Sequence, residues 1–160
     1  MKRILYILAA VAVVAAALFS FSPTLYYEKV ECSIAMRDSV HLHTAIYKPR
    51  WGKNHPILVM RTPYSCAPYG DDFLDYLNEN YLYRNYLRRG YILVFQDVRG
   101  RFMSEGEFEN LRPALGTTNE ATDAYDTVDW LVGNIDGNNG RVGFYGCSYP
   151  GFYATYAALC

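Results

Sequence analysis

The sequence predicts an α/β protein in which an antiparallel hairpin leads into a parallel sheet covered by helices. Residues 28–47 alternate between apolar and polar side chains, a period of two that is typical of strands. Arg37, Asp38 and Ser39 interrupt this alternation and mark the turn of the hairpin. Beyond the hairpin, short apolar runs alternate with segments of helical periodicity, and this order favours a parallel sheet with helices between its strands.

Each element after the hairpin has its own signal in the sequence. The apolar runs expected to form buried strands are residues 57–60, 91–95 and 141–145. The segments with apolar side chains at helical spacing are residues 71–89 and 117–132, and a further helix is expected from Ser148 onward, through residues 153–159. Gly90 is a natural end for the first of these helices, and Thr117 forms with Glu120 a capping box that begins the second.

The first 22 residues are interpreted as a secretory leader or a signal anchor, separate from the fold. Lys2 and Arg3 give a positive start, and residues 4–21 form an almost wholly apolar run without charge. This run lies at the lower edge of the length that spans a bilayer. We therefore expect export to the periplasm or the extracellular space. Residues 4–21 would be the only membrane contact if the leader is not cleaved, and residues 23–160 would form the fold.

Composition excludes several classes of protein. With 15 Lys and Arg against 16 Asp and Glu, the net charge of −1 gives no basic surface for nucleic acid. Apolar residues make up 51% of the chain, which excludes disorder as its main state. A length of 160 residues limits the chain to one domain. Its four cysteines are too few for a disulfide-stapled mini-protein, and no obligatory disulfide is expected.

The segment Gly-Cys-Ser-Tyr-Pro-Gly at 146–151 is the strongest candidate for chemistry, because it lies between a predicted buried strand and a helix. This is the setting of a nucleophile elbow, in which Ser148 stands at the apex of a sharp turn with its hydroxyl above the sheet. The next residue must donate its backbone N–H to the oxyanion, and Tyr149 can do so. Pro150 comes one place later, where the first turn of a helix tolerates a missing N–H. Cys147 is a rival nucleophile, but a small buried filler is its expected role.

Further motifs occur in the order in which a known family has them. They are Met36-Arg37-Asp38, Arg61-Thr62-Pro63-Tyr64, Arg89-Gly90-Tyr91, Gln96-Asp97-Val98-Arg99-Gly100-Arg101, Ser104-Glu105-Gly106, Asp126-Thr127-Val128-Asp129-Trp130-Leu131 and Gly146-x-Ser148-Tyr149-x-Gly151. Over about residues 28–160 the chain resembles the CocE/NonD-type serine hydrolases. That family includes Xaa-Pro dipeptidyl-peptidases, cocaine esterases, α-amino-acid ester hydrolases and glutaryl acylases.

This resemblance implies an α/β-hydrolase fold, a small ester, amide or short peptide as substrate, and acyl transfer through an acyl-enzyme on Ser148. It also implies that the Tyr64 hydroxyl completes the oxyanion hole beside the Tyr149 N–H, and a phenol is a good neutral donor to developing negative charge. No cofactor is implied. The chain departs from the family at Ser39, where glycine is usual. It also departs at Pro150, where an acidic residue is frequent in the α-amino-acid ester hydrolases, so we do not expect a substrate ammonium to bind there.

The remaining polar residues have simpler expected roles. Asp97 is expected to pair with Arg99 or Arg101 and to hold the loop near the site. Three aspartates spaced by three on a helix are expected to form a solvated face: Asp123, Asp126 and Asp129. His41 and His43 alternate on one strand, which more often gives a polar face than a metal site, so no metal is expected.

The chain lacks one part of the expected chemistry. A serine nucleophile needs a histidine base, and in α/β-hydrolases the histidine and its acidic partner follow the serine. All three histidines, His41, His43 and His55, precede Ser148. We therefore expect an incomplete α/β-hydrolase, the N-terminal half of a catalytic domain, which is inactive alone and whose acid and histidine lie beyond residue 160. The alternative is a complete, non-catalytic binding protein tethered to a membrane.

Overall fold

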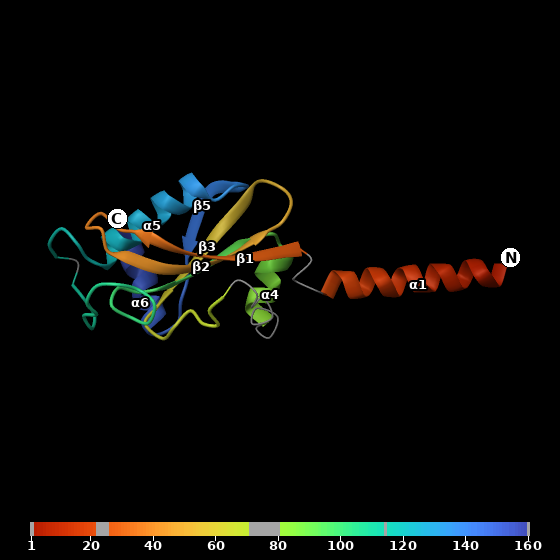
Figure 1. Cartoon of the computed structure of the whole chain (residues 1–160), viewed down its shortest axis with the longest axis horizontal. Coiled ribbons are helices and arrows are strands. Elements are labelled where there is room, and N and C mark those ends of the chain that lie inside the picture. Colours follow the sequence, from red (N-terminus) through yellow and green to blue (C-terminus); the bar gives the residue numbers. More distant parts are fainter. Residues whose placement is uncertain (1, 22–25, 71–80, 114, 160) are drawn as a thin grey trace.

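The computed structural model describes residues 2–21, 26–70, 81–113 and 115–159 and confirms the α/β architecture (Figure 1). Within these ranges five strands form one sheet in the order β1-β2-β4-β3-β5. Their bounds are β1 Tyr27–Ala35, β2 His41–Pro49, β3 His55–Thr62, β4 Ile92–Asp97 and β5 Asn138–Phe144. The helices are α1 Lys2–Phe21, α4 Tyr81–Arg88, α5 Glu120–Asn134 and α6 Tyr149–Tyr156, and a 3₁₀ turn Ala157–Leu159 follows α6. No helix in the described part of the chain combines the length and apolar character needed to cross a membrane.

β1 and β2 form the predicted hairpin. They pair antiparallel from Tyr27 opposite Pro49 to Ala35 opposite His41. In the turn between them, Ser39 has a φ of 68°, in the left-handed region that favours glycine. This strain is the physical reason for a glycine at the same place in the family that the sequence resembles.

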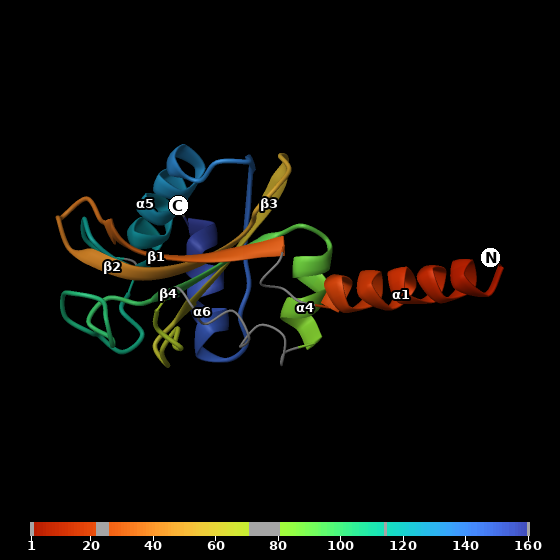
Figure 2. The ribbon, with the colours of Figure 1, turned by 45° about the vertical axis from the view of Figure 1, so that its right-hand side comes forward.

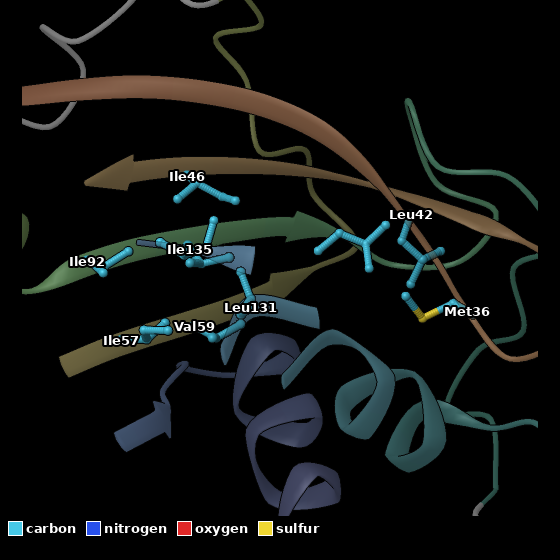
Figure 3. Close-up of a cluster of buried hydrophobic side chains, with 10 residues drawn as sticks. Met36, Leu42, Ile46, Ile57, Val59, Ile92, Leu131 and Ile135 are labelled. Carbon is cyan, nitrogen blue, oxygen red and sulfur yellow. The ribbon is translucent and has the colours of Figure 1, made fainter. Parts of the chain in front are cut away.

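β3 and β4, in the middle of the sheet, are covered on both faces. β5 is exposed or half-buried along its length, so the prediction of a buried strand at 141–145 was wrong, because in the described residues β5 lies at the edge of the sheet. β3 pairs in parallel with β4 on one side and with β5 on the other. Leu93 and Phe95 of β4 belong to a hydrophobic cluster with α4, whereas Ile92 and Val94 pack in a second cluster with Leu131 of α5. The helices therefore cover opposite faces, as the second cluster and the turned view show (Figures 2 and 3). This two-sided burial explains why the central strands are continuous apolar runs in the sequence.

The predicted start of α5 was wrong by a few residues. Asn119, not Thr117, is the N-cap, and its side chain accepts hydrogen bonds from the backbone N–H groups of Ala121 and Thr122. The hydroxyl of Thr122 in turn accepts from the Asn119 N–H, which completes the capping box. The helix consequently begins at Glu120, because asparagine caps a helix as well as threonine does.

Other element boundaries are close to the predicted ones. β5 begins at Asn138, three residues early, because Asn138 pairs with His55 at the start of β3. α6 begins at Tyr149, where a helix was predicted from Ser148 onward. Gly90 ends α4 as predicted, with a φ of 76°. Residues 71–80, the first part of the predicted helix 71–89, lie outside the described residues.

Candidate active site

Ser148 lies at the junction of β5 and α6, where the strand ends and the chain turns sharply into the helix. Its backbone has φ 58° and ψ −126°, a conformation that L residues rarely adopt. Such a residue persists only where the surrounding structure enforces it, and strained residues of this kind cluster at active sites. The side chain is exposed. This geometry matches the strand–turn–helix setting in which the sequence placed Ser148.

Two glycines let the strand end and the helix start approach closely. A Cβ on Gly146 would lie 2.3 Å from the carbonyl carbon of Pro150, and one on Gly151 would lie 3.2 Å from the Gly146 oxygen. The first distance is shorter than any real Cβ contact, so only glycine fits at residue 146. Pro150 is buried in the first turn of α6, where its missing N–H leaves no bond unmade.

Tyr149 and Tyr64, the two predicted oxyanion donors, come from different parts of the chain and lie side by side. Tyr149 is the first residue of α6, so its backbone N–H has no acceptor within the helix. Tyr64 follows the end of β3, and the two rings meet edge to face with centroids 6.3 Å apart. The Tyr64 side chain is 62% exposed. The structure thus brings both candidate donors to the end of the sheet that carries Ser148.

The phenol of Tyr149 also fixes the long loop that follows β4. It donates a hydrogen bond to the Asn110 side chain and accepts one from the Leu111 N–H, each at 2.7 Å. Its ring centroid lies 6.5 Å from that of Phe108, and the guanidinium of Arg101 lies 5.0 Å from the Phe108 ring centroid. These contacts could not be predicted from the sequence, because this loop has no periodic pattern of apolar residues that would indicate which of its side chains face α6.

Asp97 does not pair with an arginine, so the prediction of an ion pair there was wrong. Its carboxylate is fully buried and accepts hydrogen bonds from the Cys66 N–H at 2.7 Å and from the Tyr69 hydroxyl at 2.9 Å. Burial, together with the bond to Asp97, raises the pKa of Tyr69 to about 12, so this phenol remains a donor at neutral pH. Asp97 still holds a loop near the site, as predicted, but through neutral donors.

Arg99 has its carboxylate partners elsewhere. It binds Asp38 of the hairpin turn at 2.8 Å and Asp123 of α5 at 2.7 Å. Burial opposes the charge of Arg99, but the hydrogen bonds to these two carboxylates outweigh it and raise the pKa of the guanidinium. Arg99 therefore joins the hairpin, the loop after β4 and α5.

The three aspartates of α5 do not form one solvated face, which corrects the prediction. Asp123 is buried, Asp126 is half-buried and forms a 2.8 Å ion pair with Arg37, and Asp129 is exposed. Asp123 precedes the buried residues Thr127 and Leu131 by four and eight positions, the spacing of one helix face. This spacing is the signal in the sequence from which the burial of Asp123 could have been predicted.

Arg61, at the end of β3, is the centre of a buried cluster that sequence reasoning missed. Its side chain is 1% exposed and donates to the Gln96 side chain and to the Glu120 carbonyl, each at 2.8 Å. Its guanidinium lies 3.1 Å from the Glu120 carboxylate and 3.5 Å from that of Asp123. Burial, opposed in part by Arg61, raises the pKa of Glu120. The cluster fixes α5 against β3 beneath the start of α6.

The histidines have partners away from Ser148, and no candidate metal cluster exists among the described residues. His41 lies 3.1 Å from Glu105, and His43 lies 3.5 Å from Glu31. His55 binds the Gly90 carbonyl at the start of the parallel strands.

Cys147 is exposed, so its predicted role as a buried filler was wrong. In the described part of the chain β5 has a neighbour only on its β3 side, which leaves the turn after β5 without cover on its outer side. An exposed thiol beside Ser148 makes Cys147 the necessary control in any labelling of the serine.

Comparisons with known proteins agree with this geometry. Cocaine esterase from Rhodococcus sp. (strain MB1 Bresler) is 34% identical over 134 residues, which cover 79% of this chain and 20% of the esterase. An aminopeptidase from a marine sediment archaeon, Thaumarchaeota archaeon, superposes with a TM-score of 0.72 at 38% identity, over 82% of this chain and 23% of that one. An α-amino-acid ester hydrolase superposes with a TM-score of 0.68 at 42% identity, over the same shares.

The chain spans only about a fifth of the length of these relatives. Its similarity to them is nevertheless spread over the hairpin, the parallel strands and the elbow, because each comparison covers about four fifths of the chain. Residues 38–159 match the X-Pro dipeptidyl-peptidase (S15) family. Together with the α/β sheet and the relatives' esterase and peptidase names, this match favours a hydrolase over a non-catalytic binding protein, and the chain belongs to the X-Pro dipeptidyl-peptidase S15 family of hydrolases.

Proposed function

We propose that this chain supplies the nucleophile and the oxyanion hole of a serine hydrolase that cleaves an ester, amide or peptide bond. The observation that carries the proposal is the backbone of Ser148, at φ 58° and ψ −126° between β5 and α6. A strained turn of this kind exposes a serine hydroxyl to substrate at the end of a sheet. In the reaction Ser148 Oγ attacks the acyl carbon, the alcohol or amine leaves, and water then hydrolyses the acyl-enzyme.

Two donors support the oxyanion in this mechanism. The Tyr149 N–H is free of any helical acceptor at the start of α6, and the Tyr64 hydroxyl belongs to the ring that meets Tyr149 edge to face. A backbone N–H and a neutral phenol both favour the negative charge that develops on the acyl oxygen. In α/β-hydrolases the histidine base follows the serine in the chain, whereas the three histidines here precede Ser148. The experiments below use the complete polypeptide, which means the protein as it is encoded, with these 160 residues in it.

The N-terminal segment places the reaction outside the cytoplasm in this proposal. Lys2 and Arg3 followed by the uncharged residues 4–21 are the features of a secretory leader. The substrates would then be small esters, amides or short peptides of the periplasm or the extracellular space.

Labelling with a fluorophosphonate probe tests the nucleophile in the complete polypeptide. We expect labelling of the natural sequence and none of Ser148→Ala, because the probe phosphonylates an activated serine. Cys147→Ala is the matched control, one residue away and equally exposed, and it should label normally. Labelling that persists in Ser148→Ala, or that disappears only in Cys147→Ala, would contradict the proposal.

A further inference from the structure

The carboxylate of Asp97 is a buried charged group that the proposed reaction does not use. It lies at the end of β4 and is 0% exposed. A carboxylate in such a place needs several donors to replace its water. Among the described residues these donors are the Cys66 N–H at 2.7 Å, the Tyr69 hydroxyl at 2.9 Å and the Met103 N–H at 3.4 Å. None of these donors is a cation. The Asp97 carboxylate therefore holds neutral groups of the surrounding loops in place.

The donors belong to two loops that end beside the elbow. Cys66 and Tyr69 lie in the loop after β3, which carries Tyr64, and Met103 lies in the loop after β4. The main-chain oxygen of Asp97 adds a 2.6 Å bond from the Ser104 hydroxyl in that second loop. Asp97 is thus bound to both loops at once.

Tyr64 needs such support, because its exposed side chain cannot be fixed by packing alone. Its backbone is held on both sides. The Tyr64 N–H donates to the Thr62 hydroxyl at 3.0 Å, and the preceding carbonyl, that of Pro63, accepts from Arg101 Nε at 3.0 Å. The chain then passes through Ser65, in a strained conformation with φ 86°, to the Cys66 N–H on Asp97.

We infer that Asp97 and Arg101 are positioning residues that fix the Tyr64 hydroxyl in the oxyanion hole, Asp97 through Cys66 and Arg101 through Pro63. The inference rests on the proposed role of Tyr64. An oxyanion donor has to be held within about 0.5 Å of its productive place. A displacement of about 1 Å can lower the rate about 10²-fold.

Steady-state hydrolysis of p-nitrophenyl acetate by the complete polypeptide tests this inference through kcat and KM. Tyr64→Phe should lower kcat about 10²–10³-fold, the effect of losing one oxyanion donor. Asp97→Ala should lower kcat at least about 10-fold and leave KM nearly unchanged. Asp97→Asn should recover most of this loss, because its amide oxygen can still accept from the Cys66 N–H.

The double variant decides between positioning and a general structural effect. Asp97→Ala combined with Tyr64→Phe should be no slower than Tyr64→Phe alone, because a hydroxyl that is already absent cannot be misplaced. Arg101→Met should show the same dependence on Tyr64, and it decides the matter if Asp97→Ala does not fold. Asp126→Asn is the control. The Asp126 carboxylate in α5 binds Arg37 in the turn of the hairpin, so this substitution should leave kcat unchanged.

The outcomes separate the two claims. A normal kcat in Tyr64→Phe overturns the proposed role of Tyr64 and the positioning inference with it. A low kcat in Tyr64→Phe together with losses that multiply in the double variants overturns the positioning inference alone.

Discussion

The guanidinium of Arg61 lies against the ring of Tyr153, with its central carbon 5.7 Å from the ring centroid. Arg61 is the next-to-last residue of β3, whereas Tyr153 stands one turn after Tyr149 in α6 and stacks on it with centroids 5.2 Å apart. The buried ion cluster is thereby in contact with the helix that begins directly after Ser148, the proposed nucleophile. Substitutions in the Arg61 cluster should therefore affect both the stability of the fold and the candidate active site at Ser148.

Arg61→Met should destabilise the complete polypeptide by about 3–5 kcal/mol, because it leaves the buried carboxyl of Glu120 without its cation and leaves Asp123 with Arg99 alone. Chemical denaturation measures the change in unfolding free energy. Arg37→Met is the matched control: its ion pair with Asp126 lies at the surface, where such pairs contribute little. Equal losses of unfolding free energy in the two variants would show that the buried Arg61 cluster contributes no more to stability than a surface ion pair.

The raised pKa of Glu120 predicts how the stability of the fold depends on pH. A carboxyl whose pKa is raised by burial stabilises the fold below its ordinary value of 4.5, and this contribution is lost as pH rises through the raised pKa. The melting temperature of the natural sequence relative to that of Glu120→Gln should therefore fall as pH rises above 4.5. Relative to Glu105→Gln, the melting temperature should instead rise with pH, and it should do so below 4.5, since backbone and side-chain bonds with His41 lower the pKa of Glu105. Parallel curves for natural sequence and Glu120→Gln would contradict the prediction.

Gly146→Ala should abolish fluorophosphonate labelling, because the new methyl group would lie 2.3 Å from the Pro150 backbone and would force the elbow apart. Gly133→Ala offers a control in α5, where a Cβ meets no atom within 4 Å and alanine favours the helix. This control should label normally and melt at the same temperature or slightly higher. Full labelling of Gly146→Ala would refute the tight elbow.

Residues 23–160 expressed alone should neither hydrolyse p-nitrophenyl acetate through Ser148 nor remain monomeric. None of the histidines of this segment follows Ser148, and in the described residues β5 leaves one edge of the sheet unpaired, which is a template for aggregation. Ester hydrolysis and sedimentation measure the two properties. A soluble monomer with turnover that depends on Ser148 would reverse both expectations and return attention to His41, His43 and His55.

The N-terminal segment should export a reporter that is active only outside the cytoplasm. Fusion of residues 1–30 to such a reporter should give activity, whereas replacing Lys2 and Arg3 by glutamate should reduce it, because the positive start orients the segment. Fractionation of the cells then separates a cleaved leader from a retained anchor. An inactive fusion would count against export.

The sequence predicted the hairpin, the parallel strands and the elbow because each depends on local signals. Alternation, short apolar runs and a Gly-x-Ser-x-x-Gly pattern all act over a few residues. Tyr64 is a different case, since nothing in its own segment indicates a role as an oxyanion donor. Only the resemblance to a family suggested that role. Its place beside Tyr149 depends on β3 and β5 being neighbours in the sheet.

The buried polar groups could not be assigned in the same way. Arg61, Arg99 and Asp123 are charged residues whose burial depends on partners from β3, the loop after β4 and α5. Sequence spacing within one element says which residues share a face, but it does not say which charge from another element will meet them. The wrong partner for Asp97 has the same origin, since its donors lie 31 and 28 residues away in the chain.

The left-handed backbone of Ser148 has a consequence for how this chain can change over time. Glycine would occupy that conformation without steric cost, and it would relieve strain of about 1–3 kcal/mol. A change to glycine would therefore gain stability and lose the hydroxyl on which the proposed reaction depends. At this residue, selection for stability and selection for the proposed activity would act in opposite directions.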